Sequence, residues 1–232
     1  EKYAQNRSFF LNGKLLNEPG MKEAFAVVYK DMYWLALNGK AYILDGLQPI
    51  QTDKSAPYSN RQYAGFYCTG IPARVMWVED NVLYFGSDGG QIRSFYTDPA
   101  SQLSYNDDGA PIYACWTTPD IFGKNFHRFK TFSQFYVGIS AAAATSVRAW
   151  ARENGLWEEQ FFDETTARYF DWENITWDKW SWSTDTTPQT IGQKIRIKKV
   201  DKAAFRVEND ALNEPFGLEH INIEFVETGY YK

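Results

Sequence analysis

Short apolar runs separated by turn residues recur along this 232-residue chain. Residues 81–96 (NVLYFGSDGGQIRSFY) have the pattern of a strand, an Asp-Gly-Gly turn and a second strand. Residues 32–44 (MYWLALNGKAYIL) show the same pattern about fifty residues earlier. A unit that recurs at this spacing is typical of the blades of a β-propeller, and closed propellers have about four to eight blades. The chain holds about two such units, so we predict a partial propeller that further chain or neighbouring copies complete.

Each unit is predicted to be a meander of three strands. Residues 24–44 contain two apolar runs around Lys30-Asp31, and Asn38-Gly39, a strong hairpin signal, precedes the third run. Residues 74–96 follow the same scheme. Residues 48–65, between the two meanders, are polar and rich in turn-forming residues, which predicts a long surface loop.

Beyond residue 120 apolar and polar residues alternate with period two. In residues 194–198 (KIRIK) isoleucines alternate with basic residues, and residues 220–227 (HINIEFVE) alternate in the same way. This pattern indicates antiparallel strands that each bury one face. Strands are predicted at residues 131–140, 145–153, 156–163, 168–172, 193–200, 203–208 and 220–227. We therefore predict an all-β chain, with a propeller-like meander domain at residues 1–120 and an antiparallel β-sandwich at residues 121–232.

Charge and hydropathy limit the classes of partner. The formal net charge is −5, so the chain has no overall basic field that would hold a nucleic-acid backbone. Residues 194–202 (KIRIKKVDK) form a local basic strip, which favours the solvated face of a strand. No apolar run is long enough for a bilayer-spanning helix, so we expect no membrane span.

No catalytic, cofactor-binding or metal-binding residue is predicted, and we expect a non-enzymatic chain. The two histidines, His127 and His220, belong to no recognisable Ser-His-Asp or Cys-His motif. Cys68 and Cys115 fit neither a redox motif nor a zinc pattern; we expect free thiols, and a bridge between them stays open. Residues 106–109 (NDDG) lack the spacing of a calcium loop and indicate a hairpin turn.

Four tryptophans crowd into eleven residues: Trp172, Trp177, Trp180 and Trp182. In an extended segment Trp180 and Trp182 share one face. Exposed indole rings form a surface on which a protein partner or a sugar ring stacks, whereas buried rings fill or cover a core. We take these four residues as the candidate contact for a partner or a glycan, and core packing is the competing interpretation.

Several segments of the chain resemble a family of phage proteins. They are KIRIKKVDK (residues 194–202), FRVENDALNEPFGL (205–218) and ETGYYK (227–232), together with NDDGAPIYACW (106–116) and VLYFGSDGG (82–90). These segments are similar to the C-terminal region of virion structural proteins of tailed bacteriophages and Gram-positive prophages. Such proteins are sometimes labelled tail or packaged-DNA stabilisation proteins.

The resemblance implies an architectural role in a phage tail, nozzle or neck. Its implied partners are other virion proteins and further copies of the same chain, with passive contact to packaged DNA. The implied location is the virion, after synthesis in the cytoplasm of the bacterial host. No catalytic residue comes with the resemblance. The alternative hypothesis is a carbohydrate- or receptor-binding β-module that uses an exposed tryptophan cluster.

Overall fold

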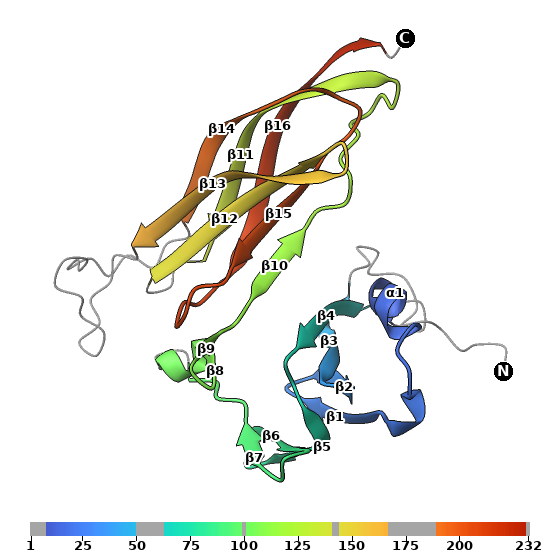
Figure 1. Cartoon of the computed structure of the whole chain (residues 1–232), viewed down its shortest axis with the longest axis vertical. Coiled ribbons are helices and arrows are strands. Elements are labelled where there is room, and N and C mark those ends of the chain that lie inside the picture. Colours follow the sequence, from blue (N-terminus) through green and yellow to red (C-terminus); the bar gives the residue numbers. More distant parts are fainter. Residues whose placement is uncertain (1–7, 50–62, 99–100, 141–143, 167–188, 231–232) are drawn as a thin grey trace. The chain divides into compact units, whose positions relative to one another are not determined.

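The computed structural model describes residues 8–49, 63–98, 101–140, 144–166 and 189–230. In these residues the chain is all-β, with several antiparallel sheets (Figure 1). The described helices are short: η1 (Phe9–Leu11), α1 (Asn12–Leu15), η2 (Met21–Glu23) and η4 (Gln102–Tyr105). The chain divides into two compact units, Glu1–Thr97 and Asp98–Lys232, which we call the N-terminal unit and the C-terminal unit.

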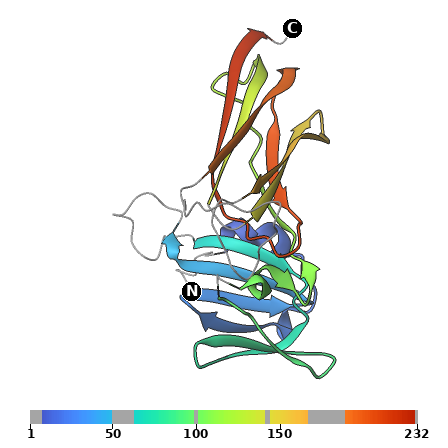
Figure 2. The same ribbon diagram turned by 90° about the vertical axis from the view of Figure 1, so that its left-hand side faces the viewer.

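The first sheet of the N-terminal unit is a four-stranded meander. Its strands follow one another in chain order: β1 (Phe25–Tyr29), β2 (Met32–Leu37), β3 (Lys40–Pro49) and β4 (Tyr63–Thr69). Figure 2 shows the four strands side by side, in blue to cyan. The three strands predicted within residues 24–44 are confirmed. Part of the predicted loop at residues 48–65 belongs to β3 and β4, because Pro49 pairs with Tyr63 and because Ala64 and Gly65 pair with β3. Residues 50–62 lie outside the described residues.

The second sheet of this unit is a three-stranded meander. It consists of β5 (Ala73–Glu79), β6 (Val82–Ser87) and β7 (Ile92–Ser94), as residues 74–96 predict. Asp80 and Asn81 connect β5 to β6 with φ values of 48° and 61°. Lys30 and Asp31 connect β1 to β2 with φ values of 48° and 60°. Positive φ at both positions of a two-residue loop is the requirement of the type I′ hairpin turn.

The two hairpins share one register at a spacing of fifty residues. Phe25 pairs with Ala36 in the first hairpin, and Val75 pairs with Gly86 in the second. Every pair from Phe25↔Ala36 to Tyr29↔Met32 has its equivalent fifty residues later, from Val75↔Gly86 to Glu79↔Val82. The repetition visible in the sequence is therefore a repetition of structure. It ends after β6, where the turn at Gly90 is longer.

The two sheets share one hydrophobic core within the N-terminal unit. The first sheet contributes Tyr29, Ala36, Ala41 and Ile43, and the second contributes Ala73, Met76, Leu83 and Phe85. Phe95 lies between the sheets, with its ring centroid 5.2 Å from that of Trp34 and 5.5 Å from that of Phe85. Each sheet thus buries one of its faces against the other.

Glu18 anchors the segment before β1 to the first sheet. Its carboxylate accepts hydrogen bonds from Lys40 Nζ, from the Tyr42 hydroxyl at 2.7 Å and from Asn38 Nδ2 at 3.4 Å. The hydrogen bonds from Lys40 and then Tyr42 lower the pKa of Glu18 to about 2. The Glu18 side chain is buried, so this charge is held by its partners rather than by water.

The C-terminal unit contains two large sheets. One has the order β10-β15-β12-β13, with β10 (Ala114–Thr117), β15 (Ala204–Asn209), β12 (Ala144–Glu153) and β13 (Leu156–Thr166). The other has the order β14-β11-β16, with β14 (Gln189–Val200), β11 (Arg128–Ile139) and β16 (Leu218–Tyr230). Six strands match predicted strands to within a few residues. The seventh prediction, residues 168–172, lies outside the described residues.

The structure divides the chain between Thr97 and Asp98, whereas the sequence interpretation placed the boundary near residue 120. Strand β10 explains the difference, because it pairs with β15 and so belongs to the C-terminal unit. The pairing joins segments about ninety residues apart, which local patterns do not indicate.

The NDDG segment is a hairpin turn, as predicted. It joins β8 (Asn106–Asp107) to β9 (Ala110–Pro111), and Asp108 and Gly109 have φ values of 52° and 83°. The Asn106 side-chain oxygen accepts the Gly109 backbone N–H at 3.0 Å, which stabilises the turn locally.

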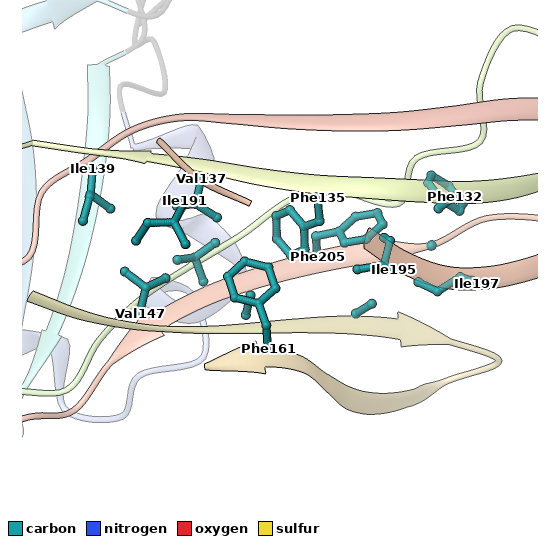
Figure 3. Close-up of a cluster of buried hydrophobic side chains, with 14 of the residues drawn as sticks. Phe132, Phe135, Val137, Ile139, Val147, Phe161, Ile191, Ile195, Ile197 and Phe205 are labelled. Carbon is teal, nitrogen blue, oxygen red and sulfur yellow. The ribbon is translucent and has the colours of Figure 1, made fainter. Parts of the chain in front are cut away.

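One aromatic-rich core holds the two C-terminal sheets together. Phe132, Phe135 and Ile195 come from one sheet, and Phe161 and Phe205 come from the other. Figure 3 shows these side chains filling the space between the strands. The ring centroid of Phe135 lies 5.0 Å from that of Phe205 and 5.6 Å from that of Phe161, both in edge-to-face geometry. Such pairs are favourable beyond the area they bury.

The period-two predictions hold on both flanks of this core. Ile195 and Ile197 of β14 are buried, and the basic residues between and beside them are exposed. Strand β14 is an edge strand, so its lysines and arginine also discourage pairing with another strand. In β16, Ile221, Ile223 and Phe225 pack against the core, and His220 is exposed.

Acid should destabilise the N-terminal unit through Glu18. Its folded pKa, about 2, lies below the ordinary 4.5, so the unfolded chain binds the proton first. The stabilisation is therefore complete above about pH 4.5 and is lost as the pH falls towards about 2. Thermal unfolding of wild type and Glu18→Gln should differ most near neutral pH and converge towards about pH 2. Glu23→Gln, on an exposed residue, is the control; a pH-independent Glu18→Gln difference would refute the assignment.

Truncating Phe135 should destabilise the C-terminal unit. Phe135→Ala removes a fully buried ring and should lower the free energy of unfolding by about 3–5 kcal/mol. Phe126→Ala removes an exposed ring of the same unit and should cost about 1 kcal/mol or less. Hydrogen exchange of β11 and β15 peptides in urea, read by mass spectrometry, measures this unit separately. Equal losses in the two variants would contradict the core assignment.

Candidate functional site

The tryptophans predicted as a contact surface lie outside the described residues. Trp172, Trp177, Trp180 and Trp182 all fall within residues 167–188. Their role as a partner or glycan contact stays a prediction from the sequence. The described residues offer two other surfaces, one on each unit.

The surface on the C-terminal unit is a row of alternating arginine and aromatic side chains, which we call the arginine ladder. It occupies the face of the β10-β15-β12-β13 sheet that points away from the core. On β12 its members alternate with the buried Val147, Ala149 and Ala151, so the strand pleat sets their direction. The ladder comprises Arg148, Trp150, Arg152, Trp157, Phe162 and Arg206.

Cation–π contacts connect the members of the ladder. The Arg206 guanidinium carbon lies 5.3 Å from the Trp150 ring centroid and 4.8 Å from that of Trp157. The Arg152 guanidinium carbon lies 5.3 Å from the Trp157 ring centroid. Arg148 is 5.3 Å from the Phe162 ring. These separations are within the range of about 6 Å at which the ring quadrupole attracts a cation.

Each ladder arginine also has a carboxylate partner. Arg206 Nε lies 3.2 Å from Glu208 Oε2, and Arg152 Nη2 lies 2.8 Å from Asp120 Oδ1. Arg148 reaches two carboxylates, Glu159 at 3.4 Å and Asp210 at 3.3 Å. The three guanidinium groups thus lie beside carboxylates as well as over aromatic rings, which makes the face chemically mixed.

Glu208 is the buried centre of this network. One of its carboxylate oxygens accepts the Tyr113 hydroxyl at 2.8 Å, and the other accepts Trp150 Nε1. Burial, followed by hydrogen bonds to Cys115 and Glu208, raises the pKa of Tyr113, so the phenol stays protonated and keeps donating. Both oxygens of Glu208 face donors of the protein itself. The arrangement suits an anchor better than a general base, which needs an oxygen directed at a reactant.

A pocket of about 400 Å³ lies at the Arg152 end of the ladder. Its lining includes Asp120, whose second oxygen accepts Lys202 Nζ at 2.8 Å. The hydrogen bonds from Lys202 and Arg152 lower the pKa of Asp120, so this carboxyl is charged at neutral pH. With Asp201 also in the lining, two carboxylates balance two cations. The pocket therefore offers no surplus charge to attract an ion.

Sequence reasoning missed the ladder because it is assembled across strands. Tyr113 and Trp150 are 95 and 58 residues from Glu208 along the chain. One local signal was present: Arg148, Trp150 and Arg152 occupy alternate positions and so share a face of any strand.

The remaining chemistry-bearing residues do not gather. His127 and His220 are exposed; Cys68 is half-buried and Cys115 exposed, both as free thiols. Within the described ranges no three His, Cys, Asp or Glu side chains lie close enough together to hold a metal ion. No helix among the described residues has the length and apolar character that crossing a bilayer requires.

Comparison with known proteins adds no family. No protein-family model and no curated protein matches this chain. The surfaces themselves therefore carry the functional argument.

The second surface consists of the two outward hairpin faces of the N-terminal unit, the faces that point away from the shared core. On the β1–β2 hairpin Val28 and Tyr33 are 65% and 44% exposed. On the β5–β6–β7 meander Val75 and Ile92 are 51% and 72% exposed. Beside Val75 the rings of Trp77 and Tyr84 stack with centroids 5.6 Å apart. Both faces are apolar, and neither is covered by its own sheet partner.

Replacing Glu208 should test whether the ladder depends on its buried carboxylate. Glu208→Gln removes the charge opposite Arg206 and replaces one of the two acceptor oxygens by a donating amide group, so the unfolding free energy should fall by about 2–4 kcal/mol. Glu159→Gln, on the same face but half exposed, should cost about 1 kcal/mol or less. Urea denaturation with hydrogen exchange of β12 and β15 measures both. Equal effects would show that Glu208 is not the centre.

Proposed function

We propose that this chain is a non-enzymatic structural subunit of a tailed-phage virion, in the tail, nozzle or neck. It assembles with its own copies and with other virion proteins. The resemblance of residues 82–90, 106–116 and 194–232 to phage structural proteins supplies the context. The exposed sheet faces supply the means of assembly.

In this proposal the N-terminal unit is a partial propeller and the C-terminal unit is a β-sandwich. The N-terminal sheets are consecutive meanders that pack face to face, which is how neighbouring blades pack. The C-terminal sheets, three and four strands, enclose one core between them. The two layers of the proposed sandwich cover each other's apolar faces. The proposed partial propeller leaves apolar faces uncovered.

The observation that carries the proposal is the pair of outward hairpin faces. A sheet with apolar residues on both faces is stable in water only when something covers each face. The N-terminal unit covers one face of each sheet and leaves Val28 and Val75 open on the others. Large exposed apolar faces of this kind mark contact surfaces between proteins.

The arginine ladder supports contact with a different partner. Arginine and aromatic side chains are the residue types that most often dominate binding energy at protein interfaces. In the ladder they are already fixed by Glu208 and Asp120, so a partner would bind without ordering them first. We assign this surface to another virion protein.

Glycan binding is the alternative, and it depends on the tryptophans of residues 172–182 alone. A titration of tryptophan fluorescence with cell-wall or capsule polysaccharide separates the two functions. Quenching that Trp180→Ala abolishes would favour the carbohydrate-binding module, and release of reducing sugar from the same polysaccharide would overturn the non-enzymatic assignment.

Self-assembly is the expected outcome for the purified full-length chain. Sedimentation velocity from about 1 µM to about 1 mM should show species larger than the monomer whose fraction rises with concentration. Arg206→Ala removes a ladder residue and should leave this self-association unchanged, because the ladder is assigned to another partner. A chain that stays monomeric over the whole range would refute self-assembly.

A further inference from the structure

We propose that copies of this chain pack head to tail, the outward face of the β5–β6 hairpin in one copy covering the outward face of the β1–β2 hairpin in the next. This inference rests on the proposed function and identifies the occupant of both faces as a second copy of the same chain. The contact between the two hairpins inside one chain is its template.

Inside one chain the two hairpins use opposite faces to make their contact. The β1–β2 hairpin presents Val27, Trp34 and Ala36 to the core, and the β5–β6 hairpin presents Leu83 and Phe85. Under the fifty-residue equivalence Leu83 corresponds to Tyr33, not to Trp34. The pleat places these neighbours on opposite sides of a strand. The hairpins therefore stack front to back, like successive identical blades.

The free face of the second hairpin is equivalent to the buried face of the first. Val75, Trp77 and Tyr84 stand fifty residues after Phe25, Val27 and Trp34, with the same pairing partners. All six are apolar or aromatic. The β1–β2 face that packs on the β5–β6 hairpin inside the chain therefore has an equivalent on β5–β6. The side chains of this equivalent face point away from the core.

The free face of the first hairpin is equivalent to the buried face of the second. Its residues and their equivalents are Ala26 and Met76, Val28 and Val78, Tyr33 and Leu83, Leu35 and Phe85. Each member of this face is apolar or aromatic. The chain therefore exposes both halves of a contact that it already makes once internally.

The segment before β1 leaves this face open. Leu11 packs against Gly65 of β4, where a Cβ atom would lie 2.7 Å from Leu11 Cγ. Glu18 reaches Tyr42 of β3. The segment thus lies over the β3–β4 side of the sheet, and Val28 and Tyr33 on the β1–β2 side stay exposed.

The hairpin turns meet in the same arrangement, but the hydrogen bond between them inside the chain is not repeated between copies. Inside the chain the Tyr29 hydroxyl donates to the Asn81 carbonyl at 3.1 Å, so the β1–β2 and β5–β6 turns are neighbours. Fifty residues after Tyr29 stands Glu79, and the equivalent of Asn81 is Asp31, which adjoins Lys30. In the contact between copies Glu79 of one chain would therefore face the Asp31 turn of the next, where a carboxylate cannot donate the hydrogen bond that Tyr29 donates inside the chain.

Two different faces give a heterologous contact, which forms a ring or an open filament according to the rotation between copies.

Val28→Glu should block one face and Val75→Glu the other, each at an exposed position where the monomer should still fold. Each variant alone should sediment as a monomer at concentrations where wild type assembles. Leu156→Glu, an equally exposed position in the C-terminal unit, is the matched control and should assemble like wild type.

Mixing the two variants gives the decisive result. Val28→Glu retains an intact β5–β6 face, and Val75→Glu retains an intact β1–β2 face, so the mixture should form a one-to-one dimer that cannot grow. A mixture that stays monomeric, while wild type assembles, would overturn the head-to-tail contact and leave self-assembly itself intact. A monomeric wild type would refute the proposed function instead.

Discussion

The register of the hairpin turns determines which residues of each strand face the core. Lys30-Asp31 and Asp80-Asn81 are two-residue loops in which four residues other than glycine adopt the left-handed conformation. That conformation costs roughly 1 kcal/mol for each such residue and is most accessible to Asn and Asp, so the turns are selective about their sequence. A slip of one residue in either hairpin would move its whole apolar set to the other face.

The two units differ in how the apolar faces of their sheets are covered. In the C-terminal unit the apolar faces of two sheets meet each other, and the outer faces carry lysines, carboxylates and the arginine ladder. In the N-terminal unit the sheets also meet, but their outer faces repeat the apolar character of the inner ones. The first solution is complete within a chain. The second leaves apolar side chains exposed on the outer faces.

Alternation along single strands made most of the fold predictable. Six strands of the C-terminal unit and three strands of each meander follow from period two and from turns such as Asn38-Gly39. Features that depend on pairing between strands far apart in the sequence could not be predicted. Strand β10 is short, its Trp116 is exposed, and only its ladder with β15 assigns it to the C-terminal unit. The environment of Glu208 needs three strands at once, and no spacing in the sequence indicates it.

Two stacked hairpins with unlike faces leave one face of each kind uncovered. Any linear stack of such hairpins leaves one face of each kind at its ends, and adding hairpins moves the ends apart without removing them. A two-fold symmetric dimer would join like with like, Val28 against Val28 or Val75 against Val75, and would leave the other kind uncovered. A head-to-tail arrangement covers both with one kind of contact. The fifty-residue identity of register is therefore a constraint on assembly as well as on the fold.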